Sequence, residues 1–216
     1  MTIDTTTRVR RCWLVALAAT AAAGPWCVPR AAPTGTRPTH PALKRLGVDL
    51  SRHGVVVMLR HARTEPGVGD PPGYSLADCR SQRQLSADGR AQSQRIGPAL
   101  AAQGLVPTQV RSSRWCRCLD TATLAFGQAT PWQALDSFFD AREREPAQSA
   151  ELRQALVAQP AGEVAVWVTH MVNIAALSGE SLGLGEAVLL RGERDVDGRP
   201  RVITLGRVAT DTQTAK

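Results

Sequence analysis

The sequence predicts an α/β sandwich with a mainly parallel sheet. Two short apolar runs, at 55–59 (VVVML) and 164–168 (VAVWV), have the composition of strands buried on both faces. Segments with helical spacing separate these runs, and strands that alternate with helices are typical of parallel sheets. The chain has 216 residues, of which 43% are hydrophobic and 21% are charged, so we expect one globular domain and a tail.

A long loop and a well-capped helix are expected after the first strand. Residues 60–81 are polar and rich in glycine and proline, which predicts a loop. Ser86 is a favourable N-cap, and Asp88 would lie in the first turn of the helix that follows. Apolar residues continue this helix to about Gln103, and Gly104 ends it.

The rest of the chain continues the alternation of strands and helices. The expected elements are a brief strand at 109–112, a helix at 115–125, an amphipathic helix at 145–158, the second buried strand at 164–168, a helix that starts at 173–177, and strands at 187–190 and 201–208. The dipeptide Asp197-Gly198 predicts the turn between the last two strands. The sequence shows no internal repeat and no GxxxxGK[ST] loop.

Residues 1–23 have the order of a secretory signal. A basic start is followed by an uncharged apolar run at 12–23 and by small residues before a cleavage point. This run is too short to span a bilayer comfortably, so no stable membrane span is predicted. The pair Arg10-Arg11 also resembles a twin-arginine signal. We therefore expect an exported, periplasmic protein; the alternative is an uncleaved alanine-rich helix packed on the domain.

The predicted signal divides the chain into three parts. They are a signal peptide at 1–23, a proline-rich linker at 24–41 and the folded domain at 42–216. The net charge of +7 follows this division, because residues 1–50 carry +5 and residues 51–216 carry only +2. A basic signal and linker explain most of the charge, so no nucleic-acid partner is predicted.

The domain contains three cysteines, namely Cys79, Cys116 and Cys118. Cys116 and Cys118 are too close to bridge each other easily, whereas Cys79 can pair with either. Free, partly buried thiols are the interpretation that we prefer, and a disulfide in an exported protein is the alternative. No CxxC pair and no His/Cys cluster with zinc spacing occurs, so no metal site is predicted.

Histidines and arginines follow three predicted strands at their carboxyl ends, where α/β sheets bind ligands. These segments are RHART at 60–64, RSSRWCR at 111–117 and TH at 169–170. Arginine presents a planar fork of donors that matches phosphate oxygens, and a neutral imidazole is a competent nucleophile toward phosphorus. The combination predicts phosphoryl transfer through a phosphohistidine, without a metal or another cofactor.

Four segments resemble motifs of the histidine phosphatase (phosphoglycerate mutase-like) superfamily, in the same order. They are LRHART at 59–64, QLSADGRAQS at 84–93, SSRWCRCLDTA at 112–122 and VTHMVNIAALSG at 168–179. The resemblance covers residues 54 to about 180. It implies a three-layer α/β/α sandwich of the phosphoglycerate mutase-like type and a metal-independent phosphatase activity.

The resemblance also implies a role for individual residues. His61 would be the nucleophile that accepts the phosphoryl group. The phosphate pocket would consist of Arg60, Arg117 and His170. Thr64 would support the loop, and the secondary contacts would come from Arg63, Arg83 and Ser113. The loop at 65–81 and the segment at 179–191 would shape specificity.

The family pattern does not identify the residue that would donate a proton to the leaving group. Many relatives have an acid two residues after a leucine, where this chain has Ser137. We prefer Asp140, because it follows Phe138-Phe139 and partial desolvation there would raise its pKa toward a useful value. Asp136, or no acid at all, is the alternative.

Two functions of different classes are compatible with these residues. The first is a phosphatase that acts on a small phosphorylated substrate or on a phosphorylated envelope component. The second is a non-catalytic or weakly active module that binds a phosphorylated ligand in the same pocket. A mutase is disfavoured, because the chain lacks room for the insertions that hold a second phosphorylated group. The sequence indicates neither the natural substrate nor the oligomeric state.

Overall fold

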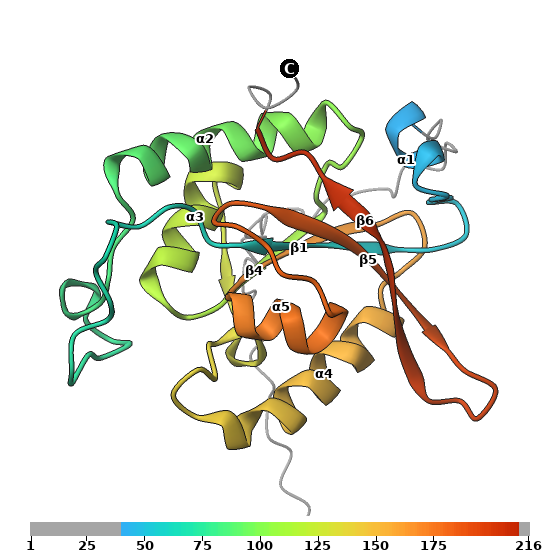
Figure 1. The fold of residues 1–216 in the computed structure, drawn as a ribbon. Coiled ribbons are helices and arrows are strands. Elements are labelled where there is room, and N and C mark those ends of the chain that lie inside the picture. Colours follow the sequence, from blue (N-terminus) through green and yellow to red (C-terminus); the bar gives the residue numbers. More distant parts are fainter. Residues whose placement is uncertain (1–39, 212–216) are drawn as a thin grey trace, which may run out of the picture. The chain divides into compact units, whose positions relative to one another are not determined.

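The computed structural model describes residues 40–211 (Figure 1). The predicted signal peptide at 1–23 and nearly all of the predicted linker at 24–41 lie outside the described residues. The fold begins one residue before the predicted domain, because Pro41 opens the short helix α1 (Pro41–Arg45). Proline suits the first position of a helix, where its missing N–H has no intrahelical partner. No helix within 40–211 has the length and apolar character needed to cross a membrane.

The centre of the domain is a six-stranded sheet in the order β3-β2-β4-β1-β5-β6. The strands are β1 (Val55–Arg60), β2 (Gln109–Ser112), β3 (Thr130–Pro131), β4 (Val164–Thr169), β5 (Ala187–Arg194) and β6 (Pro200–Val208). The first four are parallel to one another, and β5 and β6 continue the sheet as an antiparallel hairpin. The predicted mainly parallel sheet is confirmed, and each predicted strand is present within a few residues.

Helices cover both faces of this sheet (Figure 1). They are α2 (Ala87–Ala101), α3 (Cys116–Phe126), α4 (Glu145–Val157) and α5 (Met171–Ser178). Alternate residues of β1 point to opposite layers: Val57 packs in a core with α2 and α3, and Met58 packs in a core with α4 and α5. This alternation follows from the two-residue period of a strand and confirms the three-layer α/β/α sandwich.

The register of the two central strands brings the two predicted catalytic histidines together. Arg60 at the end of β1 pairs with Thr169 at the end of β4, in parallel. The next residues along the two strands are His61 and His170, and the backbone N–H of His61 donates to the carbonyl of Thr169 at 3.0 Å. Both imidazoles therefore leave the sheet at the same edge, as expected for the carboxyl ends of parallel strands.

The first turn of α2 packs closely against the loop that follows His61. Ser86 is the N-cap, as predicted, and its hydroxyl accepts from the backbone N–H of Gly89 at 3.0 Å. A Cβ atom on Gly89 would lie 1.8 Å from the carbonyl oxygen of Arg63. Only glycine permits this approach, so Gly89 sets the distance between α2 and the segment that carries His61.

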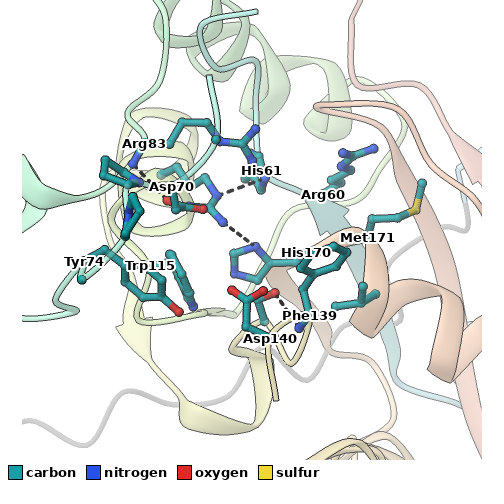
Figure 2. A pocket seen from close by; sticks show the side chains of 17 residues that line it. Arg60, His61, Asp70, Tyr74, Arg83, Trp115, Phe139, Asp140, His170 and Met171 are labelled. Atoms are coloured by element: carbon teal, nitrogen blue, oxygen red, sulfur yellow. Dashed lines mark hydrogen bonds and ion pairs between the residues drawn. The ribbon is translucent and has the colours of Figure 1, made fainter. Parts of the chain in front are cut away.

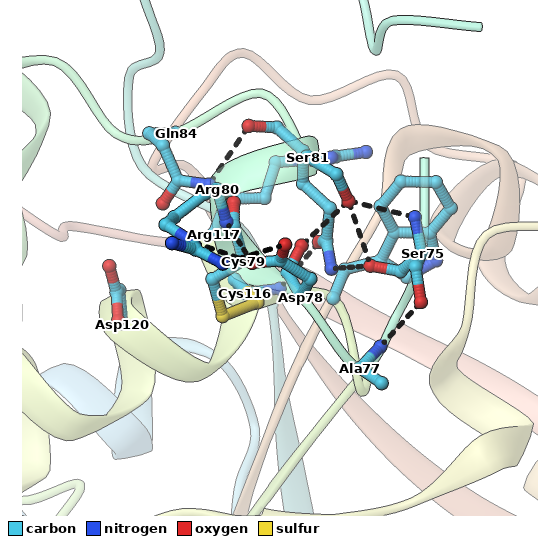
Figure 3. The surroundings of a disulfide bond; sticks show 12 residues. Ser75, Ala77, Asp78, Cys79, Arg80, Ser81, Gln84, Cys116, Arg117 and Asp120 are labelled. Atoms are coloured by element: carbon cyan, nitrogen blue, oxygen red, sulfur yellow. Dashed lines mark hydrogen bonds and ion pairs between the residues drawn. A yellow bond between two sulfur atoms is a disulfide. The ribbon is translucent and has the colours of Figure 1, made fainter. Parts of the chain in front are cut away.

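The prediction of free thiols is wrong for two of the three cysteines of the domain. Cys79 and Cys116 form a disulfide, with Cα atoms 5.6 Å apart, and only Cys118 is free among the described cysteines (Figure 3). Asp78 caps a short 3-10 helix at Cys79–Ser81. Cys116 is the first residue of α3, directly before Arg117. The disulfide therefore attaches the long loop after β1 to the helix that carries Arg117.

Removing this disulfide should lower the stability of the domain. The bond closes a loop with a sequence separation of 37 residues. We expect the double variant Cys79→Ser/Cys116→Ser to lose about 2–4 kcal/mol of unfolding free energy, measured by urea denaturation. A reductant should destabilise the wild type by a similar amount and leave the double variant unchanged. A wild type that is insensitive to reductant would contradict this prediction.

Candidate active site

His61 is the first residue after β1, and it is 2% exposed. Its Nδ1 lies 2.9 Å from the carbonyl oxygen of Ala62. Because a carbonyl only accepts hydrogen bonds, Nδ1 carries the proton and Nε2 keeps its lone pair. Nε2 accepts a hydrogen bond from Nε of Arg117 at 3.3 Å. The backbone therefore selects the tautomer in which Nε2 can act as a nucleophile.

His170 is the N-cap of α5, and two side chains behind it fix its orientation. Its Nε2 lies 2.9 Å from Oγ of Ser113, and this Oγ lies 3.2 Å from Oδ1 of Asp136. An ionised carboxylate only accepts, so Ser113 donates to Asp136 and accepts from Nε2–H of His170. The opposite nitrogen, Nδ1, accepts from Nη2 of Arg117 at 3.5 Å. The two imidazole rings lie 5.5 Å apart.

Arg117 joins the two histidines. It is 4% exposed, and its guanidinium lies over the ring of Trp115, 4.4 Å from the centroid. Its Nη1 donates to Oδ1 of Asp70 at 3.0 Å. The planar fork that arginine offers to a carboxylate is the same fork that it offers to a phosphate. A phosphoryl group in this pocket would therefore compete with Asp70 for Arg117.

Two further arginines line the same pocket. Nη1 of Arg60 donates to the carbonyl of Leu182 at 2.6 Å, and Nη1 of Arg83 donates to the carbonyl of Val68 at 3.2 Å. Nε of each is buried and has no hydrogen-bond partner among the described residues. Burial lowers the pKa of both guanidinium groups, and the neighbouring arginines lower it further. Three crowded cations with unused donors make an anion site.

The pocket is a cavity of about 560 Å³ (Figure 2). Burial is the main cause that lowers the pKa of His61, to about 3, and the positive charge of Arg117 lowers it further. The same two causes, in the same order, lower the pKa of His170 well below its usual value. Both imidazoles are therefore neutral at neutral pH, and His61 does not need to lose a proton before it attacks.

The lowered pKa values predict that stability falls on mild acidification. In the unfolded chain a histidine takes up a proton near pH 6.5, whereas native His61 resists protonation down to about pH 3. Between these values the unfolded state binds more protons, so stability is lost as the pH falls. His61 alone should account for about 2 kcal/mol of lost unfolding free energy between pH 7 and pH 5.

This pH dependence can be assigned with two variants. Urea unfolding at pH 7 and pH 5 should show a smaller acid-dependent loss for His61→Asn than for the wild type. His53→Asn, which replaces an exposed histidine, should keep the full loss. Identical pH dependence in all three proteins would show that native His61 is protonated as easily as in the unfolded chain.

The comparisons with known proteins identify the fold. No protein-family model and no curated protein matches the chain. Solved structures do match it. A mycobacterial glucosyl-3-phosphoglycerate phosphatase is 22% identical, with a TM-score of 0.51 over 69% of this chain and 96% of its own. The protein histidine phosphatase SixA is 17% identical, with a TM-score of 0.53 over 72% and 97%. A phosphoserine phosphatase from Entamoeba histolytica is 14% identical, with a TM-score of 0.51 over 73% and 98%.

The chain has the histidine phosphatase fold. This agrees with the resemblance that four motifs of the sequence show. Among the residues that the motifs indicated, the pocket contains Arg60, His61, Arg83, Arg117 and His170. Ser113 lies directly behind His170, where it orients the imidazole rather than contacting a ligand.

Arg63 and Thr64, which the motifs also indicated, lie outside this pocket. Arg63 forms an ion pair with Asp88 at 2.9 Å, in the first turn of α2, and does not line the cavity. Thr64 is buried and forms an isolated β-bridge with Leu85, which supports the loop but does not reach the pocket. The chain turns toward α2 directly after His61, so Thr64 supports the loop, as the resemblance implies, and the substrate contact of Arg63 stays a prediction.

The two candidate proton donors have different environments. Asp136 is buried and accepts from the backbone N–H of Arg114 at 2.8 Å and from its Nε at 2.7 Å. It does not line the pocket, so it is a positioning residue and not a donor to substrate. Asp140 does line the pocket, but it is exposed. The expected desolvation is absent, because Phe138 turns into the core while Phe139 is 63% exposed.

Several pocket residues were not predicted from the sequence, and among them are Asp70, Tyr74 and Trp115. Asp70 and Tyr74 come from the loop at 65–81, which was expected to shape specificity, whereas no residue of 179–191 lines the pocket. Composition alone gives no signal for Asp70. Two features could have indicated these residues. One is the disulfide at Cys79, near the end of the loop, and the other is the position of Trp115 next to Cys116.

Neither a metal centre nor a second nucleophile emerges from the described residues. Within 40–211, no three His, Cys, Asp or Glu side chains are grouped as metal ligands. The thiol of Cys118 lies 3.4 Å from Nε2 of His170. Complete burial raises its pKa to about 12, so it stays a protonated thiol behind the pocket.

Proposed function

We propose that this protein is a metal-independent phosphatase that hydrolyses a phosphomonoester through a phosphohistidine on His61. The observation that carries the proposal is the unprotonated Nε2 of His61, in a pocket with three arginines and a second histidine. The structural neighbours named as phosphatases support the same assignment. The substrate is a small phosphorylated molecule or a phosphorylated component of the cell envelope.

The first step transfers the phosphoryl group to the protein. Arg60, Arg83 and Arg117 bind the phosphoryl oxygens, and Nδ1 of His170 accepts from Arg117 and so holds that guanidinium in place. The lone pair of His61 Nε2 forms the P–N bond while the bond from phosphorus to the ester oxygen breaks. The departing oxygen takes a proton from Asp140, the carboxyl at the pocket rim that no arginine pairs with among the described residues.

The second step releases phosphate. A water molecule attacks phosphorus on the phosphohistidine and gives a proton to Asp140. A new P–O bond forms, the P–N bond breaks, and its electron pair returns to Nε2 of His61. His61 is then ready for another substrate, because the carbonyl of Ala62 still holds the proton on Nδ1.

A phosphate-binding module without turnover is the second candidate function. Two observations favour it: Ser137 occupies the position of an acid in many relatives, and Asp140 is exposed rather than desolvated. In this alternative the arginines bind a phosphorylated ligand, and the covalent step does not occur. The two functions therefore differ in whether His61 becomes phosphorylated.

Trapping the intermediate decides between the two. The full chain is mixed with p-nitrophenyl phosphate in the presence of a chelator and quenched at alkaline pH, where phosphohistidine survives. Mass spectrometry of peptides should place the phosphoryl group on His61, and His61→Asn should lose it while His53→Asn keeps it. Phosphate binding without a covalent intermediate and without turnover would instead establish the binding module.

We also propose that the protein is exported. The disulfide between Cys79 and Cys116 supports this, because structural disulfides persist mainly in oxidising compartments. Protein recovered from the cell envelope should have an intact mass that lacks roughly the first 23 residues, as expected for a cleaved signal. Full-length protein in the cytosol would contradict export and leave the phosphatase proposal untouched.

A further inference from the structure

Two parts of the pocket differ in chemistry. Its basic part consists of the three arginines and His61, and the rest of its lining includes a set of mostly apolar side chains, called the outer set below. The outer set consists of Pro71, Pro72, Tyr74, Trp115 and Phe139. We propose that this outer set is the leaving-group site, and that it selects phosphomonoesters whose leaving group is aromatic or apolar and carries no negative charge. This inference rests on the proposed phosphatase function.

An aromatic wall starts directly at the phosphate-binding arginine. The guanidinium of Arg117 lies over the ring of Trp115, and the ring of Tyr74 lies 4.5 Å from that of Trp115 at an angle of 42°. The ring of His170 meets Trp115 edge to face, with centroids 5.7 Å apart. A leaving group attached to a phosphoryl group on Arg117 would therefore emerge against aromatic surface, which suits rings and apolar chains.

Phe139 extends this wall to the mouth of the pocket. It is 63% exposed, although the preceding residue, Phe138, is fully packed in the core. Large aromatic side chains exposed at the mouth of a cavity provide apolar area that a ligand can cover. Such burial of a ring by a ligand strengthens binding without a hydrogen bond.

Charge excludes an anionic leaving group from the outer set. Asp140 lies on the side of the pocket that carries Tyr74 and Trp115, and Arg60 and Arg83 lie away from it (Figure 2). Arg142 stacks on Phe139, 5.3 Å from the ring centroid, and does not line the pocket. Neither Arg142 nor another arginine outside the basic part lines the pocket, so a carboxylate or a second phosphate on the leaving group would face Asp140 without an arginine of the lining to pair with.

The wall is held in place before any substrate binds. The loop that carries Tyr74 is tied to α3 by the disulfide between Cys79 and Cys116. A second tie within this loop is the hydrogen bond that the backbone N–H of Arg83 donates to Oδ1 of Asp70 at 3.0 Å. A preformed surface costs little conformational entropy when a ligand binds, so it can contribute to selectivity.

The selectivity is tested with esters of similar alcohols. We compare kcat/KM for benzyl phosphate, glycerol 3-phosphate and 3-phosphoglycerate, all of which release an alkoxide-type oxygen. Benzyl phosphate should be favoured over glycerol 3-phosphate by about tenfold or more, as expected for burying an aromatic ring. 3-Phosphoglycerate should be the poorest substrate. Tyr74→Ala and Phe139→Ala should each reduce the preference for benzyl phosphate, and Val106→Ala, an exposed residue outside the pocket, should not.

Phosphonates bind without being hydrolysed, so their affinities test the leaving-group site independently of turnover. Benzylphosphonate should bind the full chain about tenfold more tightly than methylphosphonate, and Tyr74→Ala should remove the difference. Equal binding of both phosphonates, with ester hydrolysis intact, would overturn the leaving-group site and leave the phosphatase in place. A preference for benzylphosphonate without hydrolysis would support the site and overturn the phosphatase. Binding of neither phosphonate would overturn both.

Discussion

Replacing His61 by asparagine should abolish turnover and leave phosphate binding largely intact. The nucleophilic Nε2 is lost in this variant, while the three arginines that bind the phosphoryl oxygens remain. Loss of a nucleophile removes the covalent route altogether, so we expect kcat to fall by at least about 10³-fold. Because the anion site is retained, the Kd for inorganic phosphate should change by only a few-fold.

Steady-state hydrolysis of p-nitrophenyl phosphate and phosphate binding by calorimetry measure these two effects. The matched control is His53→Asn, which replaces an exposed histidine outside the pocket and should retain wild-type kcat. The far-ultraviolet circular dichroism of both variants should match the wild type. A His61→Asn protein with a tenth or more of the wild-type kcat would show that another group attacks phosphorus.

The pair of histidines could be predicted from the sequence because strand composition and strand ends are local signals. The runs at 55–59 and 164–168 contain enough β-branched residues to identify buried strands, and a parallel register then aligns His61 with His170. The two-residue strand β3 could not be predicted, because Thr130–Pro131 has neither the length nor the pattern of a strand. Its place is set by pairing with β2.

The direction of each side chain after a strand end was not predictable from spacing. Arg63 lies two residues after His61, and the sequence does not show that Asp88 at the start of α2 would pair with it. Asp140 follows two phenylalanines, and only the structure shows that one of them is buried and the other exposed. In each case a contact between segments distant in sequence decided the outcome.

Loop residues were the hardest part of the site to predict. Asp70 and Tyr74 lie in a segment that has no periodic pattern, and their position depends on the disulfide at its end. The sequence left open whether Cys79 pairs at all, so the loop could not be attached to α3 in advance. Prediction of the pocket was therefore good at the sheet edge and poor where the loop closes over it.

Arg117→Met should lower kcat/KM by about 10²–10³-fold, the size expected when one donor to a developing charge is removed. This side chain is hydrogen-bonded to both histidines. Arg117→Lys should have an intermediate effect, because lysine keeps the charge but lacks the planar fork. Steady-state kinetics with p-nitrophenyl phosphate measures both variants.

A second measurement identifies the electrostatic part of this effect. Burial is the largest cause of the low pKa of His61, about 3, and the charge of Arg117 comes next. Removing a nearby positive charge favours the protonated imidazole, so the pKa of His61 should rise in Arg117→Met and rise less in Arg117→Lys. Titration of the ring protons by NMR follows this change directly. An unchanged pKa in Arg117→Met would contradict the close approach of the guanidinium to His61.

A variant of Asp70, the ion-pair partner of Arg117, shows whether the loss of activity in Arg117→Met comes from a loss of stability. Arg117→Met alone leaves Asp70 without its ion pair, and this loss could weaken the loop. The double variant Arg117→Met/Asp70→Asn removes the unpaired charge as well, so it should regain stability in urea without regaining activity. Recovery of activity in the double variant would show that Asp70 alone inhibited the enzyme. Continued loss would show that the guanidinium itself binds the phosphoryl group, because Asp70 no longer competes for the site.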